Sequence, residues 1–233
     1  MGFLDSFKIR SALAQHQKGN IAAARAAYEE LYAKGVLSAQ YMLPWSYILL
    51  REGGEENYKK AKELLSKAQK APDLTPQRRT DLLVNFAVAD YKLGALDKAV
   101  ELLERVHQKS PCGETYGTLG YLLIEQGDAE KALAFNQSAL EYDDEDPIIL
   151  DNLGQIYYRL LNDREKALEY FQKAHEIKPT QIDTLWFLSR YDLEAGKKED
   201  AIEKLETALE GRFSPLNYLT RAKAEEEIAR LRA

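Results

Sequence analysis

The sequence predicts an all-helical protein built from repeated pairs of helices, and three observations support this prediction. Ala, Leu, Glu and Lys, which favour helices over strands, recur throughout, whereas only 7 of the 233 residues are proline. Apolar residues return at steps of three and four, which places them along one stripe of a helix. A block of similar sequence also recurs along most of the chain, which indicates a repeat architecture.

Each repeated block contains two small residues at fixed places. The first is an alanine, and its spacings from block to block are 38, 33, 35 and 34 residues. The second follows seven residues later and is alanine or valine. Small side chains at regular places indicate that two helices cross closely there, because larger side chains would hold them apart. The two columns are Ala61, Ala99, Ala132, Ala167 and Ala201, and then Ala68, Val106, Ala139, Ala174 and Ala208.

Glycine and acidic residues mark the turns of the blocks. Gly94, Gly127 and Gly196 each lie five residues before an anchoring alanine. Glycine breaks the first helix of a block, and an acid that follows it favours the start of the second. The acidic run 143–146 is interpreted as the start of a helix that Pro147 opens, because the helix dipole favours negative charge there.

The block that begins at Pro147 carries the most complete pattern. Its characteristic residues are Leu150, Leu153, Gly154, Tyr157, Ala167, Phe171 and Pro179. These residues resemble the tetratricopeptide repeat family. The block departs from the family pattern by a leucine in place of the first tryptophan and by one residue inserted around Leu161-Asn162. The resemblance covers essentially the whole chain and implies a right-handed superhelical α-solenoid of about six helix-turn-helix repeats.

The resemblance also divides the chain into units. One array is expected over residues 1–213, and residues 214–233 are expected to form a C-terminal capping helix that starts at Ser214-Pro215, an N-cap followed by proline. At the other end, Phe3, Leu4, Phe7 and Leu13 form a stripe that is expected to pack on the following helix. The expected repeat units are residues 5–37, 42–75, 80–112, 113–146, 147–181 and 182–213.

Composition and motifs argue against several classes of function. The net charge of −6 disfavours nucleic acid, and no apolar run approaches the roughly 20 residues of a membrane span. The single cysteine, Cys112, and the lack of a secretory signal in Met1–Lys8 lead us to expect a cytoplasmic location. The sequence contains no phosphate-binding loop, no paired cysteines and no His-Glu-x-x-His motif. We therefore expect a protein that is not an enzyme and that holds no metal or cofactor.

The resemblance implies that the first helices of successive units line a concave groove, and that this groove binds a peptide or helix of a partner protein. Aromatic residues could anchor the bound segment of the partner, asparagine amides could form hydrogen bonds with its backbone, and arginines could pair with its acidic side chains. Some of these aromatics could equally belong to the core between repeats. The candidate groove residues are Asn85, Tyr91, Tyr121, Asn152, Tyr158, Arg159, Trp186, Phe187 and Arg190.

Some members of the family hold the acidic tails of heat-shock chaperones through a clamp of two lysines, two asparagines and an arginine. Asn152 falls at one clamp position in this sequence. The flanking lysine positions hold Gly117 and Asp183, and the arginine position holds Phe187. We therefore expect no binding of such a tail.

Alternatives to a binding scaffold remain open at this point. The chain could assemble with copies of itself through the ends or grooves of the solenoid, as a homo-oligomer. It could bind single-stranded RNA, as a related helical-repeat family does, although acids at the groove positions disfavour this. It could be an enzyme, although nothing beyond the chance convergence of acids and arginines supports that role.

Overall fold

The structure is a computed structural model and describes residues 2–233, so that Met1 of the N-terminal stretch discussed above lies outside the described residues. Over this range the chain forms thirteen α-helices and one short π-helical segment, with no strand. The predicted helical-repeat fold is thus confirmed. Also within residues 2–233, none of the helices combines the length and the apolar character needed to span a bilayer.

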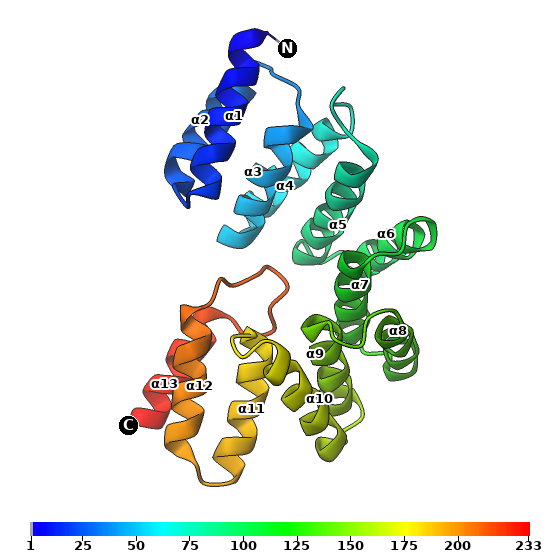
Figure 1. Ribbon diagram of the computed structural model, residues 1–233, viewed down its shortest axis with the longest axis vertical. Coiled ribbons are helices and arrows are strands. Elements are labelled where there is room, and N and C mark those ends of the chain that lie inside the picture. The colour runs from blue at the N-terminus through cyan, green and yellow to red at the C-terminus, as the bar shows by residue number, and fades with distance from the viewer. Residues whose placement is uncertain (1) are drawn as a thin grey trace. The chain divides into compact units, whose positions relative to one another are not determined.

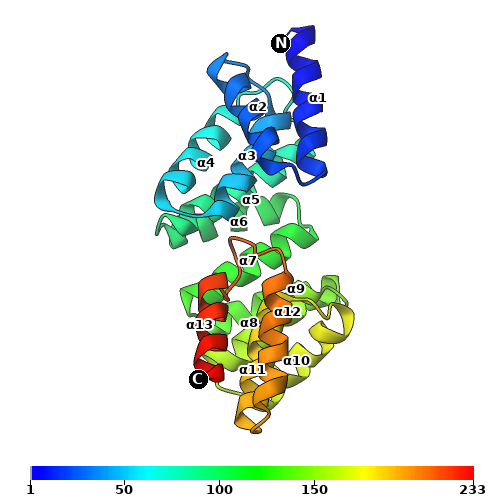
Figure 2. The same cartoon turned by 90° about the vertical axis from the view of Figure 1, so that its left-hand side faces the viewer.

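The helices follow one another in pairs, and their contacts divide the chain inside α6 into two compact units, one up to Val106 and one from His107. Figures 1 and 2 show the paired helices lying side by side in each unit. The first unit contains α1 (Phe3–Gln17), α2 (Ile21–Ala33), α3 (Ala39–Glu52), α4 (Glu55–Ala68), α5 (Pro76–Lys92) and most of α6 (Leu96–Lys109). The second contains α7 (Gly113–Gln126), α8 (Ala129–Tyr142), α9 (Pro147–Gln155), the π-segment (Ile156–Leu160), α10 (Arg164–Ile177), α11 (Ile182–Glu194), α12 (Lys198–Glu210) and α13 (Arg221–Arg232).

The two columns of small residues lie where the sequence predicts, in the contacts between helices. All five alanines of the first column are completely buried, and in the second column only Val106 keeps any exposure, at 8%. Every one of these residues lies on the second helix of its pair, from α4 to α12. Close crossing of helices at small side chains is therefore the feature on which the repeats depend.

The turns inside the pairs follow the predicted chemistry. Gly127 ends α7 in the left-handed conformation, with φ of 82°, which glycine adopts without steric cost. Asp128 then caps α8, and its carboxylate accepts a hydrogen bond from the backbone N–H of Lys131 at 3.0 Å. In the pair formed by α9 and α10 the left-handed position is held by Asn162, with φ of 53°. The next residue, Asp163, caps α10 as Asp128 caps α8.

The inserted residue of the best-matched block is absorbed by the π-segment at the end of α9. A π-helix bonds each N–H to the carbonyl five residues earlier, and Leu161 donates to the carbonyl of Ile156 at 3.0 Å. The wider turn takes up one residue without interrupting the helix. It also places two successive tyrosines in different surroundings. Tyr157 is buried and stacks on Tyr170, whereas Tyr158 is half-buried and meets Phe187 edge to face.

Gly154 marks the closest approach between α9 and α10. A Cβ atom built on Gly154 would lie 2.5 Å from the ring of Phe171, a side chain with no exposed surface. The ring cannot swing aside, because it also stacks on Phe187 with the centroids 4.8 Å apart. Only glycine fits at this crossing.

The variant Gly154→Ala is therefore expected to lower the free energy of unfolding by about 2 kcal/mol. Overpacking costs about 1–3 kcal/mol, and the helix preference of alanine offsets up to about 1 kcal/mol of it. Urea unfolding followed by circular dichroism measures the difference. Gly113→Ala is the matched control, because its Cβ would meet nothing closer than 3.9 Å. Equal stability of the two variants would contradict the argument.

The N-terminal stripe does not pack as the sequence predicts. Phe3, Leu4 and Phe7 are 82%, 79% and 66% exposed, and the buried residues of α1 are Ile9 and Ala12. The first turn of α1 projects beyond α2 in both Figure 1 and Figure 2. The expected packing of Phe3, Leu4 and Phe7 on the following helix is therefore wrong.

The C-terminal helix also begins later than predicted. It starts at Arg221, with Thr220 as the N-cap accepting from the N–H of Lys223, and not at Ser214. Residues 213–220 instead form a non-helical segment, which we call the strap. The backbone N–H of Ser214 bonds the side chain of Asn217 within the strap itself. The proline after Ser214 is a correct sign of a turn, but this turn does not lead directly into a helix.

Candidate functional site

Five of the predicted groove residues lie on one face of the second unit. Tyr158 and Arg159 come from the π-segment, and Trp186, Phe187 and Arg190 come from α11. Arg190 lies four residues after Trp186 and three after Phe187, so that it neighbours both on the helix surface. The rings of Tyr158 and Phe187 approach edge to face, with centroids 4.9 Å apart. The structure thus brings these five residues together; whether they bind a partner stays a prediction.

The strap crosses this face and is bound to it through Asp183, in the first turn of α11. The Asp183 carboxylate accepts three hydrogen bonds from the strap: from the side-chain amide of Asn217 at 3.0 Å and from the backbone N–H groups of Tyr218 at 3.0 Å and Leu219 at 2.9 Å. Figure 1 shows this connection leaving the end of α12 and turning back into α13. Asp183 therefore fixes the strap by its backbone.

Tyr218 of the strap lies among the predicted groove residues. Its ring stacks on Phe187 with the centroids 5.2 Å apart, and the Arg159 guanidinium lies 4.4 Å from the centroid of the Tyr218 ring. The ammonium group of Lys223 lies 4.3 Å from the same centroid. One tyrosine therefore contacts residues from two successive repeats, with both an aromatic stack and cation–π contacts.

The first turns of α13 cover the remainder of this face. Trp186 is only 8% exposed, and its ring has Arg190 at 4.0 Å and Lys223 at 4.4 Å. Arg190 pairs with Glu227 at 2.5 Å, and both side chains are less than one-fifth exposed. Hydrogen bonds from Arg230 and Arg190 lower the pKa of Glu227 to about 2. The ion pair is therefore charged throughout the physiological range.

Two buried acids lie beneath the strap. Asp151 is 3% exposed and accepts hydrogen bonds from the Thr184 hydroxyl at 2.6 Å and from the Gln155 amide at 2.7 Å. Burial, and then the charge of Asp183, raise the pKa of Asp151 to about 7. Burial likewise raises the pKa of Asp183. Arg159 is the nearby cation that opposes both shifts.

Arg159 connects these acids to the preceding repeat. Its guanidinium donates to the Gln155 side chain at 2.9 Å and to Glu125 of α7 at 2.7 Å. Gln155 in turn donates to Asp151. A continuous polar network therefore runs from α7 through α9 to the acids under the strap, and every link is a charged or amide hydrogen bond.

The other four predicted residues lie elsewhere in the fold. Asn152 is buried and donates to the Gly117 carbonyl at 3.0 Å, which is a contact between repeats. Tyr121 is 6% exposed on α7. In the first unit, Asn85 and Tyr91 are half-buried on α5. Nothing in these placements tests whether the four residues bind a partner.

Sequence reasoning misses the residues that cover the site. It assigns Tyr218 and Glu227 to a capping helix, and it considers Asp183 only as a missing clamp lysine. Asn217 carries a usable signal, since Asn-Tyr after Ser-Pro is a turn composition. Among residues 2–233 no group of three His, Cys, Asp or Glu side chains is placed to hold a metal ion.

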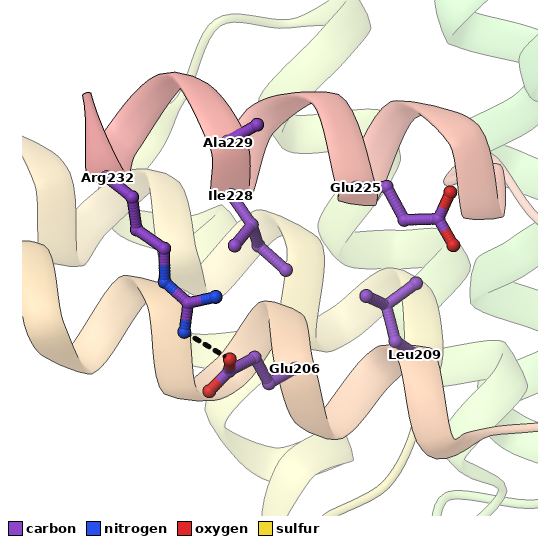
Figure 3. A pocket seen from close by; sticks show the side chains of 6 residues that line it. All are labelled: Glu206, Leu209, Glu225, Ile228, Ala229 and Arg232. Atoms are coloured by element: carbon purple, nitrogen blue, oxygen red, sulfur yellow. Dashed lines mark hydrogen bonds and ion pairs between the residues drawn. The ribbon is translucent and has the colours of Figure 1, made fainter.

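A separate hollow lies between α12 and α13. Figure 3 shows Ile228 of α13 pointing toward α12 between Glu206 and Leu209, with an ion pair between Arg232 and Glu206 at 2.5 Å beside it. The cavity measures about 420 Å³. It lies along the seam between two helices of the chain's end and does not include the residues under the strap.

Residues 113–180 match the family model described as tetratricopeptide repeat. This segment spans α7 to α10 and contains Gly154 and Phe171, which meet at the crossing of α9 and α10. Over α7 to α10 the chain is thus similar to the tetratricopeptide repeat family. A comparison with curated proteins gives no match. Beyond residues 113–180, solved structures show which fold the chain shares.

Three solved structures show the same fold. The tetratricopeptide repeat protein from Parabacteroides merdae aligns over 98% of this chain and 84% of its own, with a TM-score of 0.76 and 9% identity. TTC0263, a protein of Thermus thermophilus, aligns over 76% and 91%, with a TM-score of 0.59 and 22% identity. YrrB, described as having an unusual peptide-binding site, aligns over 76% and 88%, with a TM-score of 0.52 and 24% identity. At such identities the likeness concerns the fold alone.

Proposed function

We propose that this protein is a non-catalytic scaffold that binds an extended segment of a partner protein across the face formed by the π-segment and α11. The tetratricopeptide fold is generally a scaffold for protein interactions, and YrrB has a peptide-binding site. The observation that carries the proposal is Tyr218. A non-helical piece of polypeptide lies on Phe187 and Arg159 in this structure, so the face already accommodates a peptide segment.

The chemistry of the face fits a peptide better than a nucleic acid. Asp151 and Asp183 lie at its base, and carboxylates disfavour a phosphate backbone. Aromatic contact area contributes strongly to binding at protein interfaces. Tyr158 is half-buried, whereas Trp186 and Phe187 are 8% and 1% exposed, so these two rings offer contact area once the strap and α13 leave them. Arg190 offers a partner for an acid. The same composition supports the expectation that a chaperone tail clamp is absent.

The variant Tyr158→Ala/Trp186→Ala is expected to reduce capture of the partner at least tenfold in affinity purification from native lysate. Aromatic anchors at interfaces contribute about 2 kcal/mol or more each, and about 1.4 kcal/mol corresponds to a factor of ten. Quantitative mass spectrometry of the captured proteins, against wild type, is the measurement. Circular dichroism must show unchanged helicity.

The matched control is Tyr142→Ala/Ile177→Ala. These two residues are 53% and 47% exposed and lie on the second helices α8 and α10. Their removal should leave capture unchanged. If Tyr158→Ala/Trp186→Ala captures every protein as well as the control does, the proposed face is not the binding site.

A further inference from the structure

We infer that the face under the strap recognises a partner segment of defined chemistry, and that the protein's own residues 213–227 occupy this seat until the partner displaces them. This inference rests on the proposed function and specifies its ligand. The partner segment would present an aromatic side chain, two consecutive backbone N–H groups next to it and an acidic side chain further along. The contacts of the strap and of α13 define each of these requirements.

The first requirement comes from Asp183. Its buried carboxylate lies near a second acid, Asp151, and its strap partners are one side-chain amide and two backbone N–H groups. A buried carboxylate that loses its hydrogen bonds pays a large desolvation cost. An apolar guest would leave Asp183 without donors, and an acidic guest would add a third negative charge. The seat therefore selects a bent, non-helical backbone that offers two consecutive N–H groups to one carboxylate.

The second requirement comes from the position of Tyr218. Its ring lies on Phe187, a residue that is itself supported from below by Phe171, and it faces the Arg159 guanidinium. A planar aromatic ring satisfies both contacts at once, since it can stack on one side and receive a cation on the other. An aliphatic side chain would keep only the apolar contact.

The third requirement comes from Arg190, which pairs with Glu227. The guanidinium also lies against Trp186, so it is fixed in place and needs a carboxylate to complete its contacts. The bond runs between α11 and α13, not within one repeat. An acid in the partner segment could replace Glu227.

The strap has the character of a replaceable element. It is non-helical, and its Ser214, Leu216 and Asn217 side chains are half-buried or exposed. Its local hydrogen bonds include those from the N–H of Ser214 to the Asn217 side chain and from the N–H of Leu216 to the Ser214 hydroxyl. Leu219 is its one residue with no exposed surface, and Phe213 and Tyr218 pack against the core only partly buried. Segments with few buried apolar contacts open at lower free energy than the helices that they cover. A partner with the same three groups can therefore compete for the seat.

The test uses the full chain and a fluorescein-labelled synthetic peptide of residues 211–233 as the probe. The peptide carries all the groups that the seat is inferred to recognise. In the variant Tyr218→Ala/Glu227→Ala the resident competitor is weakened, while Asp183, Phe187, Arg159 and Arg190 remain. Fluorescence anisotropy is expected to show binding at least tenfold tighter than for wild type. A peptide with alanine in place of its tyrosine should bind neither protein.

The matched control is Tyr142→Ala/Glu210→Ala, which removes an exposed tyrosine and an exposed acid outside the seat. It should bind the peptide as weakly as wild type. Equal affinity of wild type and the strap variant for the peptide overturns the inference. So does light scattering that shows a dimer which the peptide dissociates, because the occupant would then be the C-terminal segment of a second copy.

Hydrogen exchange of the wild-type chain provides a second measurement that needs no variant. The amides of Tyr218 and Leu219 are expected to exchange at least tenfold faster than those of Leu205 and Ala208 in α12. Equal protection would overturn the inference, because the strap would then open only with the fold. Failure here is distinguishable from failure of the proposed function, because hydrogen exchange measures strap opening without any partner, whereas Tyr158→Ala/Trp186→Ala measures the loss of capture directly.

Discussion

Replacing Phe171 by alanine is expected to lower the free energy of unfolding by about 3–5 kcal/mol. The side chain has no exposed surface, and it fills the crossing of α9 and α10 against Gly154. It also stacks on Phe187 with nearly parallel planes, 6° apart. Removing the ring leaves a cavity beside Gly154, which has no side chain to fill it. Chemical denaturation followed by circular dichroism measures the change.

Ile177→Ala is the control for this variant, because Ile177 lies on the same helix and is 47% exposed. Its replacement should cost well under about 1 kcal/mol. The Phe171 variant should also loosen the strap, since Phe187 supports Tyr218 from below. A loss no greater than that of the control would show that the crossing at Gly154 does not hold the repeat together.

The variant Asp151→Asn is expected to become more stable relative to wild type as the pH rises from 5 to 9, by about 2–4 kcal/mol. Burial raises the pKa of Asp151 to about 7, whereas an unfolded aspartate titrates near 4. Between these values the folded chain binds more protons than the unfolded chain. The free energy of unfolding of the wild type therefore falls as the pH rises. Asparagine cannot ionise, so the variant does not lose stability in this way.

Denaturation of both proteins in urea at pH 5, 7 and 9 provides the measurement. Thr184 and Gln155, the hydrogen-bond partners of Asp151, can both bond an amide at this position. Some pH dependence should remain in the variant, because the pKa of Asp183 is also raised. Asp144→Asn, at an exposed position, is the control. A stability difference between variant and wild type that is the same at all three pH values would show that Asp151 stays charged when folded.

The repeat itself was predictable because its signal is local and recurs. Ala61 and Ala167 stand in equivalent positions, and each is buried at the same kind of crossing. Gly127 indicates a turn because glycine readily adopts a positive φ, and Asp128 caps the next helix by accepting a hydrogen bond from the N–H three residues later. Such features depend on neighbours in sequence, so one sequence is enough to find them.

The cover of the site was not predictable in the same way. Ser214-Pro215 has the local pattern of a helix start, but Asp183 bonds the backbone of Tyr218 and Leu219 from more than thirty residues away. That contact requires the α11 surface to exist first. The exposed Phe3 and Phe7 show the converse case, since their stripe is correct for a helix, but its burial depends on contacts with other helices.

The π-segment has a consequence for how one repeat can differ from the others. A residue added to a regular helix would rotate everything after it by about 100°, and the next helix would lose its packing. Because Ile156–Leu160 widens instead, the change of phase is confined to a single turn. Tyr158 and Arg159 are reoriented, while Ala167 and Phe171 stay in step with their counterparts. A solenoid can in this way alter the specificity of one module by a one-residue change in length, without altering the modules beside it.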